Sequence, residues 1–259
     1  MPDYSKIDTP DVLSYVFYPR NESGPCPKYA FDHFVPVDDA VAVHCRFYRQ
    51  DDSWPWILFF HGNGEVISDY DELSLFYFKY RLNIAVADYR GYGKSNGTPT
   101  VAAMARDAHK VFEAARAALK EKDLNENIWV MGRSLGSVSA FEIAHGHGPG
   151  IRGLIIESGF PSISSLIIRH GIASPDMSLD SITKECLDML KSITVPLLVI
   201  HGEYDTLVPP DEAETIMENT GSPSKELLMI PGATHNDIMF VGLRQYMEAI
   251  RRLVDATGA

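Results

Sequence analysis

The sequence has 259 residues, of which 45% are hydrophobic and 22% are charged, and these are ordinary values for a globular protein with a full core. Its formal net charge of -12 argues against nucleic acid or an anionic membrane surface as partner, because both would repel the chain. No stretch approaches the roughly 18 unbroken apolar residues of a membrane-spanning helix, so we expect no stable membrane insertion.

Three cysteines, Cys26, Cys45 and Cys186, lie far apart and without the spacing of a disulfide framework or a zinc site. The first residues lack a basic region followed by an apolar run, so they do not read as a signal peptide. We therefore expect a cytoplasmic protein that binds no metal and no cofactor.

The chain begins with a polar, proline-containing stretch, residues 1–28, which we interpret as an N-terminal extension lying over the domain. Two alternating runs, 31–37 and 40–49, then predict an antiparallel hairpin. Six short apolar runs follow, and each stops at a polar or glycine-containing turn, which is typical of strands buried on both faces of a parallel sheet. These runs are WPWILFFHG, NIAVADYRG, NIWVMGRS, GLIIES, PLLVIHGE and KELLMIPGA.

Helical patterns separate the apolar runs. Residues 101–121 have apolar positions at i, i+3, i+4 and i+7, and 135–145, 210–219 and 236–254 are further helix candidates. This alternation predicts a single α/β domain over 1–259, with a mostly parallel twisted sheet covered by helices on both faces.

One connection, residues 161–194, is longer than a crossover helix requires, and long connections in compact domains tend to be functional. We interpret this lid segment as one or two short helices above the strand ends. Its apolar side chains either line an acyl pocket or form the ordinary buried face of a lid helix: Leu166, Ile167, Ile168, Ile172 and Met177.

The motif Gly132-Arg133-Ser134-Leu135-Gly136 follows a predicted strand and opens a predicted helix. This GxSxG pattern in that context is a nucleophile elbow, a sharp turn that exposes the serine hydroxyl at the carboxyl end of the sheet. The alternative interpretation is a glycine-flanked serine that caps a helix. Arg133 either contacts a substrate or pairs with a neighbouring acid.

A serine nucleophile needs a base, and the base needs an orienting acid. In this fold the order is serine, then acid, then histidine, and Asp205 and His235 both follow predicted strands downstream of Ser134. Taken singly, Asp205 fits a turn residue and His235 a neighbour of a helix cap. Glu157, at the end of another strand, is the competing acid.

The first donor of an oxyanion hole is predicted at the Leu135 N–H, which lies at a helix N-terminus. The second is expected in the loop after an early strand, and we place it at the Asn63 N–H, with Gly64 as a neighbour that can substitute. His61 is interpreted as bracing this loop through a hydrogen bond to the local backbone.

Five ordered motifs give the sequence a resemblance to the α/β-hydrolase superfamily over residues 31–254: HGNGE, DYRGYGKS, GRSLGS, HGEYDTLVP and GATHND. The second and third are similar to those of small serine hydrolases of the peptidase-, lysophospholipase- and esterase-like branch, which includes depalmitoylating thioesterases. The resemblance implies Ser134 as nucleophile, His235 as base and Asp205 as acid, with Asn63 and Leu135 as oxyanion donors and no cofactor.

The expected reaction is hydrolysis of an ester, thioester or amide of a small-molecule acyl substrate through an acyl-enzyme. Two alternatives remain at this point: an acyltransferase on the same site, and a non-catalytic binding module that keeps the fold. The oligomeric state, monomer or homodimer, is left open.

Overall fold

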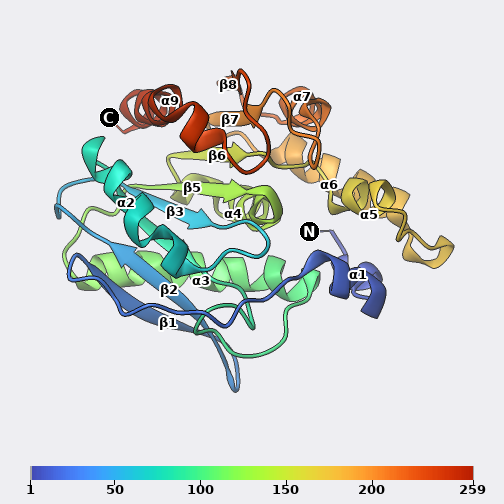
Figure 1. Ribbon diagram of the computed structural model, residues 1–259, viewed down its shortest axis with the longest axis horizontal. Helices are drawn as coiled ribbons and strands as arrows, with labels where there is room; N and C mark the ends of the chain where they lie inside the picture. Colours follow the sequence, from blue (N-terminus) through green and yellow to red (C-terminus); the bar gives the residue numbers. More distant parts are fainter. Residues whose placement is uncertain (1, 259) are drawn as a thin grey trace.

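The computed structural model describes residues 2–258, and eight strands within them form one sheet in the order β1-β2-β4-β3-β5-β6-β7-β8 (Figure 1). The β1–β2 and β2–β4 pairs are antiparallel and every other pair is parallel, so the predicted hairpin and mostly parallel sheet are confirmed. The strands are β1 (Ala30–Asp38), β2 (Val41–Tyr48), β3 (Trp56–Phe60), β4 (Asn83–Ala87), β5 (Ile128–Arg133), β6 (Gly153–Glu157), β7 (Leu197–Gly202) and β8 (Lys225–Ile230).

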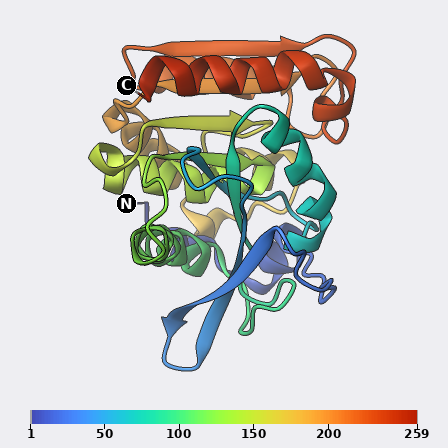
Figure 2. The same cartoon turned by 90° about the vertical axis from the view of Figure 1, so that its left-hand side faces the viewer.

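Helices cover both faces of the sheet, and Figure 2 shows α2 and α3 on opposite sides of it. Successive strand residues point to opposite faces, so Ile128 and Val130 of β5 join one apolar cluster while Trp129 and Met131 join the other. The α-helices are α1 (Pro10–Val16), α2 (Tyr70–Lys79), α3 (Val101–Glu121), α4 (Ser137–His147), α5 (Ile163–Arg169), α6 (Leu179–Ser192), α7 (Pro210–Asn219), α8 (Ile238–Val241) and α9 (Leu243–Thr257).

Two of the four predicted helices, α3 and α7, have the predicted bounds. The helix expected from residue 135 begins later, because a tight 3-10 turn over Ser134–Gly136 precedes α4. The helix expected over 236–254 is divided at Gly242, where the chain passes so close to Ile230 that a Cβ on this glycine would lie 2.6 Å from that side chain.

The N-terminal extension is more ordered than its lack of periodicity predicted. It contains α1, whose first turn carries Pro10 and whose N-cap Thr9 accepts a hydrogen bond from Val12 N–H. The Asp8 carboxylate accepts hydrogen bonds from the first two N–H groups of α3, those of Val101 at 2.7 Å and Ala102 at 3.2 Å. The extension therefore caps a principal helix of the domain.

The lid segment contains α5, of 7 residues, and α6, of 14 residues, so its second helix is longer than the short helices expected. Figure 1 shows α5 beside α1 near the ends of the parallel strands, where the Tyr15 and His170 rings lie 4.7 Å apart. Ile167 and Met177 are buried in the core and only Ile168 of the predicted acyl-pocket residues is strongly exposed. Most of these side chains therefore form the ordinary buried face of the segment.

Candidate active site

The predicted site residues lie where four parallel strands end. Asn63 follows β3, Ser134 follows β5, Asp205 follows β7 and His235 follows β8. We call this edge of the sheet the carboxyl rim. Because neighbouring parallel strands end at the same edge, residues far apart in the sequence meet there.

Ser134 lies in the sharp turn that the motif predicts. Its φ angle is 50°, in the left-handed region that non-glycine residues rarely adopt and that marks strained functional turns. The two motif glycines make the turn possible: a Cβ at Gly136 would overlap the Phe60 carbonyl, and a Cβ at Gly132 would overlap that of Gly136.

The structure joins three of the predicted side chains in one hydrogen-bonded chain. Ser134 Oγ lies 3.1 Å from His235 Nε2, and His235 Nδ1 lies 2.7 Å from Asp205 Oδ2. All three residues are buried. This is the order of contacts by which a histidine takes a proton from a serine while a carboxylate orients the ring.

Asp205 is held as an ionised acceptor. Burial alone would raise the pKa of its carboxyl. The hydrogen bonds that the carboxylate accepts from His235 and from the Val208 N–H lower that pKa below the ordinary value. Its other oxygen, Oδ1, accepts from Leu207 N–H at 3.0 Å and Val208 N–H at 2.8 Å. An ionised Asp205 makes His235 Nδ1 the donor and leaves Nε2 as the acceptor for the serine proton.

The two predicted oxyanion donors follow neighbouring strands of the sheet, β3 and β5. Leu135 is buried directly after Ser134, whereas Asn63 is exposed in the turn after β3. The Asn63 side chain fixes this turn, because its Oδ1 accepts from Tyr18 N–H at 2.8 Å and from the Tyr92 hydroxyl at 2.7 Å.

His61 braces the same loop, as predicted. Its Nδ1 lies 2.8 Å from the Gly62 carbonyl and its Nε2 lies 3.2 Å from Asp88 Oδ1. Burial alone would lower the pKa of this imidazole, but the Asp88 carboxylate raises it above the ordinary value. The fully buried ring therefore serves the loop and does not contact Ser134.

Arg133 pairs with acids, the second of its two sequence interpretations. Strand register places it beside Glu157, which it contacts through Nε at 3.3 Å, and its Nη1 pairs with Glu65. Glu157 also accepts from the Tyr246 hydroxyl at 2.6 Å. Glu157, the competing acid, thus bonds with Arg133 and Tyr246, whereas the carboxylate that contacts the His235 ring is Asp205.

Sequence reasoning missed several residues that support the site. Tyr18 and Tyr92 brace Asn63, Glu65 binds Arg133, and His201 Nε2 donates to the Val208 carbonyl at 2.7 Å beneath the Asp205 turn. Glu65, Tyr92 and His201 carried a local signal, because they lie in the HGNGE, DYRGYGKS and HGEYDTLVP motifs. Tyr18 lies outside the motifs, and its proximity to Asn63 depends on the tertiary fold.

Two further properties of the described residues bear on the site. Within residues 2–258 no group of three or more His, Cys, Asp or Glu side chains is arranged to hold a metal ion. In the same range, no helix combines the length and the apolar character needed to cross a membrane.

The sheet order, the turn at Ser134 and the residues at the carboxyl rim define an α/β hydrolase. The fold agrees with that of the esterase Pf2001 from Pyrococcus furiosus, with a TM-score of 0.74 at 21% identity over 93% of this chain and 99% of that one. It also agrees with Est1E from Butyrivibrio proteoclasticus, solved with ferulic acid bound, with a TM-score of 0.70 at 19% identity over 87% and 98% of the two chains.

The family model described as "Serine aminopeptidase, S33" matches residues 54–175 and 166–239, and the chain belongs to this family. Protein YfhR of Escherichia coli K12 is 29% identical over 87% of this chain and 81% of its own length. Human alpha/beta hydrolase domain-containing protein 17B is 29% identical over 82% and 70%, and bem46 of Schizosaccharomyces pombe is 30% identical over 72% and 63%. Family and fold together support hydrolase activity.

Proposed function

We propose that this protein is a serine hydrolase that cleaves carboxylic esters or thioesters through an acyl-enzyme. The hydrogen-bonded chain from Ser134 through His235 to Asp205 is the observation that carries the proposal. A serine hydroxyl is a weak nucleophile at neutral pH, and a neighbouring imidazole acceptor is what activates it.

In the first half-reaction, His235 Nε2 takes the Ser134 proton as Oγ forms a bond to the substrate carbonyl carbon. Negative charge develops on the carbonyl oxygen, and the N–H groups of Leu135 and Asn63 are the proposed donors to it. The tetrahedral intermediate then expels the alcohol or thiol, which receives the proton from His235.

In the second half-reaction, water replaces the departed alcohol or thiol. His235 takes a proton from the water as the water oxygen attacks the acyl carbon. When the bond between Ser134 Oγ and the acyl carbon breaks, His235 returns the proton to Ser134 Oγ and the carboxylic acid is released. The ionised Asp205 stabilises the imidazolium that forms in each half-reaction.

Apolar side chains at the rim support an ester or thioester with an apolar group. Tyr18, Tyr204, Leu207 and Phe240 are exposed and come from the segments that brace Asn63 or carry Asp205 and His235. The net charge of -12 favours a neutral or cationic substrate. The name of the Pyrococcus furiosus structural relative as an esterase supports the same bond type.

The test is a panel of p-nitrophenyl esters of increasing chain length, with an acyl-thioester and an aminoacyl amide beside them. We expect turnover of the esters or the thioester in the wild type and loss of that turnover in Ser134→Ala. The matched control is Ser139→Ala, which removes another buried serine hydroxyl from the following helix. Turnover of the amide alone would contradict the proposed bond type.

A further inference from the structure

The Arg133 guanidinium, next to Ser134 in the sequence, has four polar partners. Besides its bonds to Glu65 and Glu157, its Nη2 donates to the His235 carbonyl at 2.9 Å and to Asn236 Oδ1 at 3.0 Å. The partners belong to three segments: the loop after β3, the end of β6, and the loop between β8 and α8. We call the loop after β3, which carries Asn63 and Glu65, the oxyanion loop, and the loop between β8 and α8, which carries His235, the histidine loop. The Arg133 side chain, adjacent to Ser134 in the sequence, therefore joins these two loops.

The connection to the oxyanion loop is both electrostatic and steric. Glu65, which pairs with Arg133 through one oxygen, uses the other to accept from Gly62 N–H at 2.8 Å and from the Tyr70 hydroxyl at 2.6 Å. A Cβ on Gly62 would overlap Arg133 Nη1, so the loop backbone lies directly against the guanidinium. Asn63, the proposed donor, is the next residue.

The surroundings keep this pair charged. Burial alone would raise the pKa of Glu65, but Arg133 lowers it below the ordinary value. Glu157 responds differently, because burial raises its pKa above the ordinary value despite Arg133. A guanidinium offers five N–H donors in one rigid plane, so it can fix several acceptors relative to one another where an ammonium cannot.

We propose that Arg133 is a positioning residue that sets the spacing between the His235 ring and the Asn63 N–H, and thereby the rate of acyl transfer. This inference rests on the proposed function and deepens it. A displacement of about 1 Å at a reacting group can lower a rate by about 10²-fold. The expected signature is a fall in kcat with little change in KM, since no substrate contact is assigned to Arg133.

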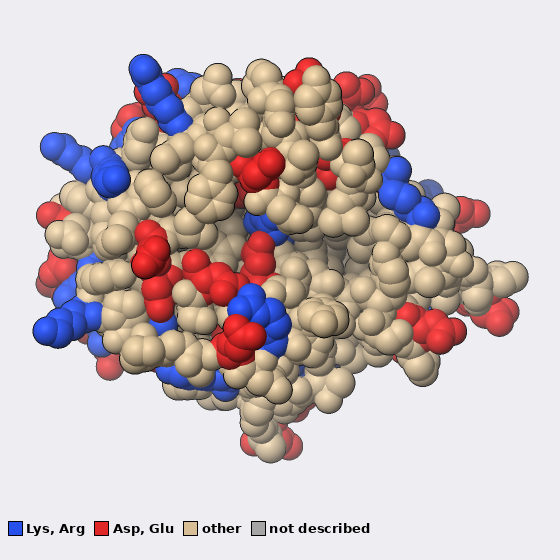
Figure 3. Space-filling view, viewed as in Figure 1, with Lys and Arg blue, Asp and Glu red and all other residues tan. Residues whose placement is uncertain are grey.

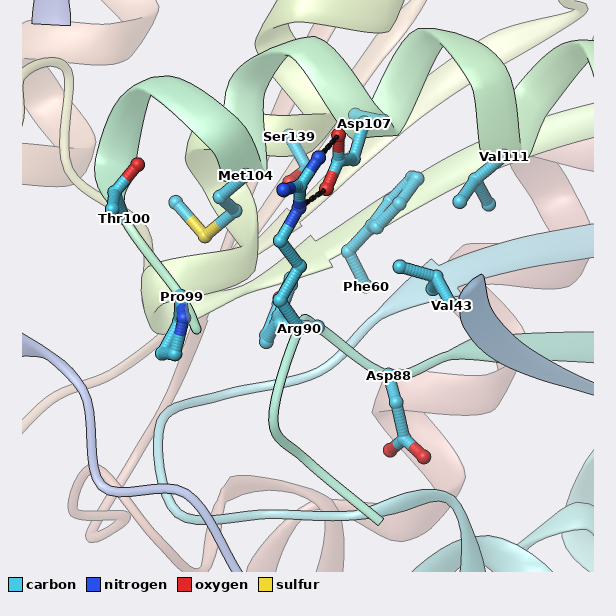
Figure 4. Close-up of a pocket in the computed structure, with 12 residues that line it drawn as sticks. Val43, Phe60, Asp88, Arg90, Pro99, Thr100, Met104, Asp107, Val111 and Ser139 are labelled. Carbon is cyan, nitrogen blue, oxygen red and sulfur yellow. Dashed lines mark hydrogen bonds and ion pairs between the residues drawn. The ribbon is translucent and has the colours of Figure 1, made fainter. Parts of the chain in front are cut away.

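Arg90 provides a matched control. Its side chain has the same 11% exposure as that of Arg133, and it binds Asp107 through two hydrogen bonds of 2.5 and 2.9 Å. Figure 4 shows this pair beside a small cavity under α3. Replacing either arginine by lysine removes a largely buried guanidinium and its paired N–H donors. Only the replacement of Arg133 should loosen the proposed site.

The first experiment compares Arg133→Lys and Arg90→Lys in ester hydrolysis, in the rate of fluorophosphonate labelling and in thermal unfolding. We expect kcat and labelling to fall by about 10²-fold in Arg133→Lys, with KM within about threefold, while Arg90→Lys stays within about twofold of wild type. Both variants should lose similar thermal stability. Equal activities of the two variants would overturn the inference.

A second experiment uses the cavity that Arg133 faces. This cavity has a volume of about 100 Å³ and is walled by side chains of α2, α8 and α9, including Tyr70, Met239 and Tyr246. On the face of the molecule that is viewed in Figure 1, Figure 3 shows a hollow near the middle with basic and acidic groups at its edge. Methylguanidinium should restore activity to Arg133→Ala and leave Ser134→Ala inactive; no restoration in a folded Arg133→Ala protein would count against positioning.

Arg133→Ala leaves Glu65 and Glu157 without a cation, which can prevent folding. Glu65→Gln then carries the test, because the amide keeps the size of the side chain and loses the ion pair. We expect its kcat to fall by about tenfold with KM little changed, and an unchanged kcat would overturn the inference. If wild type shows no labelling that depends on Ser134, the proposed function fails; if wild type is labelled at Ser134 and Arg133→Lys is labelled equally fast, only the role of Arg133 fails.

Discussion

The carboxyl rim and the lid segment are attached to the fold in different ways. At the rim, the four segments that follow β3, β5, β7 and β8 are joined to one another by the hydrogen bonds and ion pairs of His235 and Arg133. Asn63 ties the segment after β3 to Tyr18 and Tyr92. The lid segment, residues 161–194, relies on buried apolar side chains and a few peripheral polar contacts, such as Arg169 with Glu212 at 3.1 Å. The proposed chemistry therefore lies where polar bonds join distant segments, and we expect changes in the lid segment to disturb the reacting atoms less than changes at the rim.

The largest effect should come from breaking the rim at its acid. Asp205→Asn keeps the shape of the side chain but favours the wrong histidine tautomer, and we expect kcat to fall by about 10⁴-fold. Steady-state hydrolysis of the best ester measures this. Glu157→Gln is the comparator, and a greater loss in that variant would assign the orienting acid to Glu157.

A smaller effect should follow from loosening the oxyanion loop. Asn63→Ala removes the oxygen that accepts from Tyr18 and Tyr92, and two hydrogen bonds of about 1 kcal/mol each predict a fall in kcat of up to about 30-fold. Asn96→Ala, which breaks two hydrogen bonds between the Asn96 side chain and the turn and start of the β1–β2 hairpin, is the control and should leave kcat unchanged. Equal losses in both variants would argue for a general loss of stability.

The lid segment should respond more weakly and in a different kinetic constant. Arg169→Ala removes the ion pair between the exposed Arg169 and the buried Glu212, and ion pairs at the surface contribute only about 0–1 kcal/mol, so we expect KM for long-chain esters to rise by no more than about fivefold. The kcat for a short ester should not change. Lys184→Ala, which breaks an exposed pair within α6, is the control; a fall in kcat for the short ester in Arg169→Ala would show that the segment shapes the rim.

The smallest expected effect is on stability against pH. The pKa of His61 is raised in the folded protein, so its contribution is complete below the unfolded value of about 6.5 and is lost as pH rises through the folded value. The free energy of unfolding should therefore decline as pH rises from about 6.5 through the folded pKa of His61. We expect this decline in wild type and in His145→Gln, which replaces an exposed histidine, and a less steep decline in His61→Gln. Denaturant unfolding at several pH values measures the slopes, and identical slopes in the two variants would refute a charged His61.

Local pattern was sufficient for the strands, for α3 and for the three residues of the proposed triad. Each strand is a short apolar run with its own boundary, and Ser134, Asp205 and His235 each stand directly after such a run in the expected order. These features depend on neighbours in the sequence, so a single chain reveals them.

Features that depend on distant partners were not predictable. Arg133 meets Glu157, Glu65 and the His235 carbonyl from 24, 68 and 102 residues away, and no periodicity records those meetings. Helix α2 was missed for a related reason: its residues 75–78 are consecutively apolar, with Tyr77 and Phe78 buried and Leu75 exposed, so no clear helical stripe stands out.

The most direct measurement is fluorophosphonate labelling of the native protein, with the modified residue located by mass spectrometry. We predict one label on Ser134, dependent on native structure, absent in Ser134→Ala and retained in Ser139→Ala. A known serine hydrolase labelled alongside establishes that the probe is active. An unlabelled native protein, or a label that persists in Ser134→Ala, would contradict Ser134 as the nucleophile.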